Sequence, residues 1–234
     1  MKNTNPKEIL VEKVWGGRSL ERLFGKKLPK GKLIGESWMF CDKKYPVVLK
    51  LLDVKKPLSV QVHPKGKSEV WYIVEAGKSA RAVGGITLDE YKIKAGDWVY
   101  LEAGTVHTIK PPAVIFEVSQ SKLVTYRLYD WGRGTRPLDI EEGIKHIVLK
   151  AKPKILHGAN SFKCPYFSIK RYRLKVGEKI SMKGVCFVLK GCVKTGNKII
   201  NKGDALIVKE TVQATAPAVV FSVNWTIRSS SKSR

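Results

Sequence analysis

Short apolar segments, separated by turn-forming residues, run along most of the chain. They occupy residues 47–52, 70–74, 98–101, 114–118, 167–174, 185–189, 205–208 and 219–223. Segments of this kind, bounded by Gly, Pro, Asn or Asp, are typical of β-strands. Their near-regular spacing predicts an all-β sandwich or barrel rather than a fold that alternates strands with helices.

Helical periodicity is confined to two short segments. Ser19 can cap a helix over residues 20–24, and Asp139 can cap a second helix that runs to Leu149. Both residues carry the short oxygen-bearing side chains that helix N-termini favour. The second segment also carries its isoleucines on one face. The predicted all-β fold therefore contains few helices, and these are short.

The second half of the chain repeats features of the first. The turn Asn-Lys-Gly-Asp at 201–204 precedes an apolar segment, as the turn Lys-Ala-Gly-Asp does at 94–97. We predict two domains, residues 1–150 and 151–234, of which the second is a degenerate copy of the first. No histidine follows His157, so the second domain is expected to bind no metal.

Three polar residues share one face of the predicted strand 58–63. Gln61 and His63 alternate with valines, and alternate side chains of a strand project from the same face. Ser59 lies on that face as well, so its hydroxyl can meet a substrate there. Glu69 follows after a turn, and a chain that returns beside its own strand brings Glu69 close to His63.

A second histidine, His107, follows the predicted strand 98–101. Two imidazoles, a carboxylate and an amide suit a borderline divalent metal with one position open to substrate. The alternative is a pair of hydrogen-bonded histidines beside a surface glutamate. Two of the four histidines stand at strand edges beside Pro or Gly, which favours the metal. We predict that one divalent ion is bound by Gln61, His63, Glu69 and His107. Zn²⁺ is the first expectation, although Mn, Co and Fe also tolerate such ligands.

Four motifs follow one another in a fixed order. They are Gln-x-His-Pro from residue 61, Gly-Lys-Ser-Glu-x-Trp-Tyr from 66, Ala-Gly-Thr-x-His from 103 and Thr-Tyr-Arg-Leu-Tyr-Asp-Trp-Gly-Arg from 125. Together they resemble the type I mannose-6-phosphate isomerases, and most of all their short bacterial branch, over most of residues 10–147. The resemblance implies a cupin double-stranded β-helix (jelly roll), here as two tandem barrels with a catalytic, metal-binding first barrel.

This resemblance also implies an activity. It predicts a metal-dependent aldose–ketose isomerase that interconverts mannose 6-phosphate and fructose 6-phosphate through an enediolate. It places Arg127 and Lys67 in catalysis. Lys50 stands in an apolar strand, where a buried ammonium needs a partner, and the family has a substrate-site lysine there. Lys50 and Arg133 are the candidates for binding the phosphate group.

Leu123 departs from the family pattern. Members usually carry an aspartate four residues before the arginine that matches Arg127. The missing carboxylate supports an alternative, a non-catalytic sugar-phosphate-binding cupin, which would be stabilised by ligand without turnover. Two further alternatives are a different metal cupin, such as an oxygenase or another sugar isomerase, and a polyanion binder with a steep salt dependence.

The charge of the chain is strongly positive. Lys and Arg outnumber Asp and Glu by 44 to 20, which gives a net charge of +24. Such a charge attracts polyanions and phosphorylated small molecules. The basic residues are spread along the chain, apart from a dense group at 228–234, and no nucleic-acid motif is present. A lysine-rich solvated surface accounts for the charge, so nucleic acid is not the expected partner. The resemblance implies a small phosphorylated sugar as the partner, and the expected state is a monomer or weak dimer.

The cysteines and the apolar runs bear on location. The four cysteines contain no C-x-x-C pair, which predicts buried, reduced thiols. No apolar run is long enough to cross a bilayer or to form the core of a signal peptide. We therefore expect no membrane partner, and we expect a cytoplasmic location.

Overall fold

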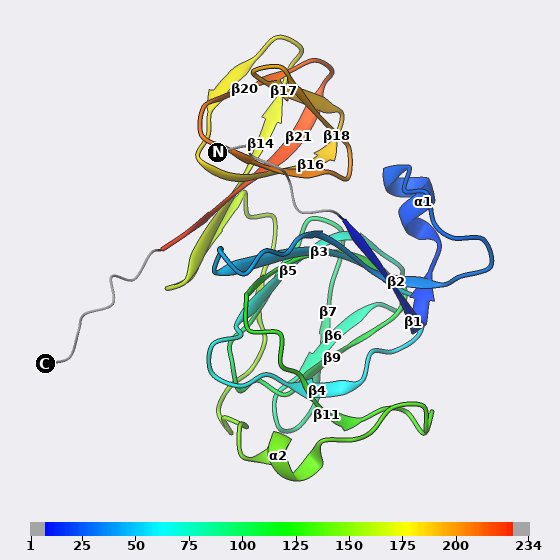
Figure 1. The fold of residues 1–234 in the computed structure, drawn as a ribbon. Helices are drawn as coiled ribbons and strands as arrows, with labels where there is room; N and C mark the ends of the chain where they lie inside the picture. Colours follow the sequence, from blue (N-terminus) through cyan, green and yellow to red (C-terminus); the bar gives the residue numbers. More distant parts are fainter. Residues whose placement is uncertain (1–7, 227–234) are drawn as a thin grey trace, which may run out of the picture. The chain divides into compact units, whose positions relative to one another are not determined.

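The structure is a computed structural model that describes residues 8–226, and it is built almost entirely from β-strands (Figure 1). The predicted all-β class is confirmed at this level. The chain separates into two compact units, one ending at Ala159 and the other beginning at Asn160. The basic group predicted at 228–234 lies outside the described residues.

The first unit contains two sheets. The larger has seven strands in the order β1-β2-β3-β10-β5-β8-β12, and the smaller has five in the order β11-β4-β9-β6-β7. Their bounds are β1 (Ile9–Gly17), β2 (Ile34–Phe40), β3 (Val47–Val54), β4 (Val60–Val62), β5 (Glu69–Ala76), β6 (Arg81–Gly84), β7 (Asp89–Lys92), β8 (Trp98–Leu101), β9 (His107–Lys110), β10 (Ala113–Gln120), β11 (Tyr126–Tyr129) and β12 (Lys154–Leu156).

The second unit also contains two sheets. One has the strand order β13-β14-β21-β16-β19, and the other has the order β15-β20-β17-β18. Their bounds are β13 (Ser161–Lys163), β14 (Phe167–Leu174), β15 (Lys179–Ser181), β16 (Gly184–Lys190), β17 (Cys192–Thr195), β18 (Lys198–Asn201), β19 (Ala205–Val208), β20 (Thr211–Ala214) and β21 (Ala218–Trp225).

The two units share a strand order. The first contains β3-β10-β5-β8 opposite β4-β9-β6-β7, and the second contains β14-β21-β16-β19 opposite β15-β20-β17-β18. The likeness extends to the two turns noted in the sequence. Gly96 N donates to Ile73 O at 2.8 Å, and Gly203 N donates to Val188 O at 2.8 Å. Both glycines adopt a positive φ, 95° and 87°, which glycine reaches without steric cost.

The inner faces of three neighbouring strands change from apolar to charged along their length. On β3, Val54 and Leu52 are followed on the same face by Lys50, because side chains two apart share a face. On β5 and β10, which flank one another in the sheet, the same change leads to Glu69 and Glu117. The apolar halves pack into one core cluster, and the charged halves therefore meet at one end of it.

The two predicted helices are present, but their ends differ from the prediction. They are α1 (Ser19–Phe24) and α2 (Ile140–Ile144), so the second is shorter than the predicted segment to Leu149. Neither Ser19 nor Asp139 caps its helix through a side-chain hydrogen bond. The Asp139 carboxylate instead accepts from Arg127 N at 3.0 Å. The predicted apolar face ends in Val148, which is 53% exposed, and the predicted helix ends in Leu149, which is 70% exposed, so no burial extends the helix.

All four cysteines are free, as predicted. Cys164 and Cys186 are buried, whereas Cys41 and Cys192 are only half-buried, so the prediction of buried thiols is wrong for the latter two. Both lie near strand ends, where the sheet leaves one side of the residue accessible. The described residues contain no helix long and apolar enough to span a membrane.

Cys186 should resist thiol reagents in the folded protein. Burial raises the pKa of its thiol to about 12, so the reactive thiolate is almost absent at pH 8. Titration with a disulfide reagent at pH 8 should modify Cys192 first and leave Cys186 unmodified until denaturant is added. Mass spectrometry of the labelled peptides distinguishes the two, and rapid labelling of Cys186 would contradict the buried position.

Candidate metal centre

Three side chains with metal-binding atoms meet where the charged inner faces converge. His63 follows β4, Glu69 begins β5 and His107 begins β9. Their ligand atoms all lie within 4.8 Å of one another, and each residue is at most 2% exposed. The sequence motifs therefore identified residues that come together, including the predicted approach of Glu69 to His63.

The geometry of this cluster directs its nitrogen lone pairs inward. His63 Nε2 lies 3.1 Å from Glu69 Oε2, and His107 Nε2 lies 3.5 Å from Glu69 Oε1. His107 Nδ1 lies 2.8 Å from Thr105 O. A proton on Nδ1 is therefore donated to that carbonyl, which leaves the lone pair of Nε2 on the side of Glu69.

Gln61 joins the cluster through its amide. Its Nε2 lies 3.2 Å from His107 Nε2, and Ser59 Oγ donates to its Oε1 at 3.3 Å. The two backbones are paired at this point, Gln61 against His107. A half-turn of the amide exchanges its oxygen and nitrogen, so Gln61 can present an oxygen to the centre of the cluster.

The charge state of the cluster fits a divalent cation. Burial lowers the pKa of His63 to about 3 in spite of the facing carboxylate, so the imidazole is neutral at neutral pH. Burial opposes ionisation of Glu69, but contacts with His63 and His107 hold the pKa of its carboxyl well below the usual value. His63 Nδ1 has no hydrogen-bond partner, and His63 Nε2 faces Glu69 Oε2 at 3.1 Å. Neutral imidazoles with unused lone pairs beside a carboxylate are the donors a borderline metal prefers.

The cluster opens onto a cavity of about 270 Å³, close to the lower end of the ~300–1,000 Å³ usual for small-molecule sites. Four other predicted site residues line it: Lys50, Ser59, Lys67 and Arg127. Arg133 is not among the lining residues. Seven of the nine predicted site residues therefore line a single cavity, and His107 joins them through the cluster.

Lys50 belongs to a buried network of charges. Its Nζ lies 3.1 Å from Glu117 Oε1 and 4.5 Å from the centre of the Trp38 ring. Burial opposes its charge, but Glu117, Glu36 and Glu69 outweigh that effect and raise the pKa of Lys50. Glu117 was missed in the sequence, although a lone carboxylate inside the apolar strand 113–120 is the same kind of signal that singled out Lys50.

Lys67 is buried beside the cluster, at 4% exposure. Its Nζ donates to Thr125 Oγ1 at 2.8 Å. Burial lowers the pKa of its ammonium, with Glu69 opposing this and Lys50 adding to it. A lysine with a lowered pKa releases its proton more readily than one in water.

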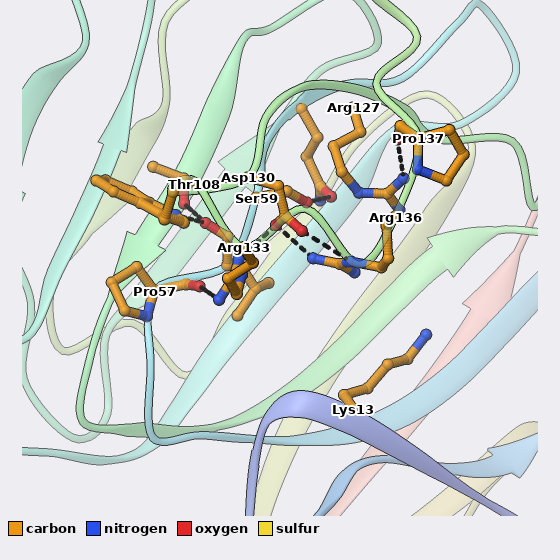
Figure 2. A network of polar contacts seen from close by, with 12 residues as sticks. Lys13, Pro57, Ser59, Thr108, Arg127, Asp130, Arg133, Arg136 and Pro137 are labelled. Atoms are coloured by element: carbon orange, nitrogen blue, oxygen red, sulfur yellow. Dashed lines mark hydrogen bonds and ion pairs between the residues drawn. The ribbon is translucent and has the colours of Figure 1, made fainter.

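Arg127 and Arg133 lie differently with respect to the cavity (Figure 2). Arg127 lines it, and its Nη1 donates to Pro137 O at 2.9 Å. Arg133 donates to Pro57 O at 2.9 Å and to the Asp130 carboxylate. A third arginine, Arg136, shares Asp130 and does line the cavity. No sequence motif pointed to Arg136, because it follows the last one.

Leu123 lines the cavity as an exposed residue, 47% accessible. The position where the family usually carries an aspartate therefore lies at the open edge. In this chain that edge is apolar at Leu123 and basic at Arg127 and Arg136.

The fold and the site together define a class: a nearly all-β protein with a buried His, His and Glu cluster, beside a half-buried Gln, in a cavity rich in lysine and arginine. Comparison with known proteins shows which proteins the chain is similar to. It is similar in sequence and in fold to mannose-6-phosphate isomerases, which confirms the resemblance inferred from the motifs. Models of known protein families gave no match.

Two relatives and one solved structure illustrate the similarity. The "Probable mannose-6-phosphate isomerase GmuF" of Bacillus subtilis is 27% identical, over 83% of this chain and 87% of the relative. The mannose-6-phosphate isomerase of Streptococcus mutans is 25% identical, over 87% of this chain and 91% of the relative. The crystal structure of the mannose 6-phosphate isomerase from Bacillus subtilis matches with a TM-score of 0.79 at 21% identity. That match covers 94% of this chain and 100% of the solved one.

Proposed function

We propose that this protein is a metal-dependent mannose-6-phosphate isomerase. The observation that carries the proposal is the buried cluster of His63, Glu69 and His107, with Gln61 beside it, open to a cavity lined by lysine and arginine. The names of the sequence relatives support it. The substrate is then a phosphorylated sugar, which also accounts for basic residues around the cavity.

The metal would be held by Gln61, His63, Glu69 and His107, and we infer Zn²⁺. One mannose 6-phosphate isomerase of similar fold has been solved bound with zinc and yttrium. A bound divalent ion supplies Lewis-acid stabilisation of negative charge on the substrate oxygens. The neutral state of His63 and the ionised state of Glu69 provide donors that need not lose a proton to bind it.

The remaining chemistry belongs to side chains around the cluster. The reaction moves a proton between C1 and C2 of the open-chain sugar. Lys67 Nζ, with its lowered pKa, is suited to hold and return a proton at the substrate oxygens or carbons. Arg127 is permanently charged and planar, so it can orient the substrate through either the enediolate or the phosphate group. Ser59 fixes Gln61 and can contact the sugar from the same face.

We infer that each unit is a cupin jelly roll, and that the first unit is the catalytic one. The support is the strand order, in which two four-stranded sheets recur in both units. Glu69 begins β5 and pairs with Leu101, and the matching position in the second unit is Gly184, which begins β16 and pairs with Val208. Glycine offers no ligand atom. Within residues 8–226 the three-residue cluster in the first unit is the one group of such donors.

The test is turnover of mannose 6-phosphate. It is monitored by coupling the formation of fructose 6-phosphate to a dehydrogenase. We expect activity in protein loaded with Zn²⁺, loss of activity after treatment with a chelator, and recovery when the metal is restored. Glucose 6-phosphate serves as the control sugar phosphate. No turnover by the metal-loaded protein would defeat the proposal.

Leu123 favours a second candidate, a non-catalytic sugar-phosphate binder. It predicts that mannose 6-phosphate raises the Tm of the protein although no product forms. The same samples used for the assay decide between the two functions. Turnover excludes the binder, and a shift in Tm without turnover excludes the isomerase.

A further inference from the structure

Three arginines lie near one buried carboxylate at the cavity, and Lys13 lines the same cavity from β1 (Figure 2). Asp130 is 4% exposed and accepts hydrogen bonds from both Arg133 and Arg136, with Arg136 Nε at 3.0 Å. Arg127 lies beside this network, where its Nη1 donates to Pro137 O, and Lys13 lies apart from it in Figure 2. Lys13, Arg127 and Arg136 all line the cavity.

The positive charge of this group is not fully neutralised by its neighbours. Besides Asp130, the nearby carboxylates are Glu36, 3.4 Å from Lys13 Nζ, and Asp139, 4.0 Å from Arg127 Nη1. Four cations thus face three carboxylates, and Glu36 is also attracted by Lys50. Like charges held this close repel one another, so an anion placed among them is stabilised.

Within the described residues, two guanidinium nitrogens of the group have no hydrogen-bond partner. Arg127 Nε is buried and has no hydrogen-bond partner. Arg136 donates from Nε and Nη2 to the Asp130 carboxylate, and within the described part of the chain its Nη1 has no hydrogen-bond partner. Guanidinium donors in a planar fork match the oxygens of a phosphate group.

The two residues that the sequence assigned to phosphate are less suited to it. Lys50 is 7% exposed and its ammonium is bound to Glu117 at 3.1 Å. Arg133 directs its guanidinium to Pro57 O and to Asp130 and does not line the cavity. A phosphate dianion entering from solvent would meet Lys13, Arg127 and Arg136 instead.

We propose that Lys13, Arg127 and Arg136 form an anion-binding rim that takes the phosphate group of a sugar phosphate, with Asp130 as a positioning residue for Arg136. The identity of the sugar rests on the proposed function, whereas the anion site does not. With the phosphate at the rim and the buried cluster on the same cavity, the substrate is held by both ends. The rim thus selects phosphorylated over free sugars.

The variants Lys13→Met and Arg136→Met test the rim. Each should weaken the binding of inorganic phosphate, measured by calorimetry and by the phosphate-dependent rise in Tm, by about tenfold or more, as expected for the loss of a charge-assisted hydrogen bond. If the protein is an isomerase, each should raise KM for mannose 6-phosphate by a similar factor with a smaller change in kcat. Where Arg136→Met does not fold, as judged by circular dichroism, Arg136→Lys keeps the charge and should retain part of the affinity.

Matched controls remove the same charge elsewhere. Lys32 and Arg22 are exposed and paired with Glu12 and Glu75, and Lys32→Met and Arg22→Met should leave phosphate binding unchanged. Arg133→Met is the more stringent control. Arg133 donates to Asp130 as Arg136 does, but it does not line the cavity. It should weaken phosphate binding less than Arg136→Met does.

The outcomes separate this inference from the proposed function. Phosphate binding that falls in Lys13→Met and Arg136→Met supports the rim even if no isomerase turnover is found. Turnover with unchanged phosphate binding and unchanged KM in both variants overturns the rim while the isomerase stands. A wild-type protein with no measurable affinity for phosphate, or equal losses in the control variants, also overturns it.

Discussion

Replacing Glu69 by glutamine is expected to abolish metal binding and, with it, isomerase turnover. Glu69 is the one carboxylate among the four proposed ligands, and it faces both histidines at 3.1 and 3.5 Å. The amide keeps the shape of the side chain but removes its negative charge. Because metal-derived charge stabilisation is worth several kcal/mol, kcat should fall by about 10³-fold or more.

Metal content and rate should fall together in the Glu69→Gln protein. Metal is measured by elemental analysis after equal exposure to Zn²⁺, and rate by the coupled assay. Glu102→Gln is the matched control, because Glu102 is exposed and lies only a few residues before His107. A Glu69→Gln protein that retains a full equivalent of metal and normal turnover would remove the basis for the proposed centre.

Replacing Lys50 by methionine should destabilise the first unit strongly. The change leaves Glu117, 5% exposed, without the ammonium that lies 3.1 Å away. Breaking one partner from a buried ion pair costs about 3–5 kcal/mol of unfolding free energy. Replacing Lys50 and Glu117 together by methionine should recover much of that loss, since no uncompensated charge then remains at the pair.

The loss of unfolding free energy caused by Lys50→Met should grow as the pH rises. Burial raises the pKa of the Glu117 carboxyl even with Lys50 present, and removing the cation raises it further. A carboxyl whose folded pKa lies above its unfolded value holds its proton in the folded state, so stability is lost as pH rises through that range. The variant should therefore be closer to wild type at pH 5 than at pH 8.

Urea unfolding followed by tryptophan fluorescence measures this prediction. Five of the six tryptophans lie in the first unit, at positions 15, 38, 71, 98 and 131, so the signal reports mainly on that unit. Lys92→Met removes an exposed lysine from β7 and should change stability by no more than about 0.5 kcal/mol. Equal stability of Lys50→Met and wild type at pH 8 would contradict the buried pair.

The sequence predicted the cluster well because its signals are local. Gln61 and His63 are two apart on one strand, and Glu69 follows after one turn, so alternation and chain return were enough to place them together. His107 was proposed from its residue type and its place beside a strand end, since the pairing of β4 with β9 that brings it to Gln61 leaves no trace in local periodicity. The strands with strong apolar patterns were found, whereas short strands such as β13, β15 and β20 were not.

The cavity edge could not be predicted for a related reason. Lys13 and Arg136 are far apart in the sequence and look like ordinary surface charges in a chain with 44 basic residues. They line one cavity only because β1 and the segment after β11 lie beside the same inner face. The helix after Asp139 was overextended because its apolar spacing is helical, whereas Val148 and Leu149, which would continue it, are exposed at 53% and 70%.

The change from apolar to charged side chains along β3, β5 and β10 has a consequence for protein engineering. Each of these strands holds the fold with one end and presents reactive groups with the other. A library that varies Lys50 and Glu117 as a pair, so that neither charge is left buried alone, would change the chemistry while Leu52, Trp71 and Ile115 keep the unit folded. The chain is thus divided, residue by residue, into positions open to selection for new substrates and positions that are not.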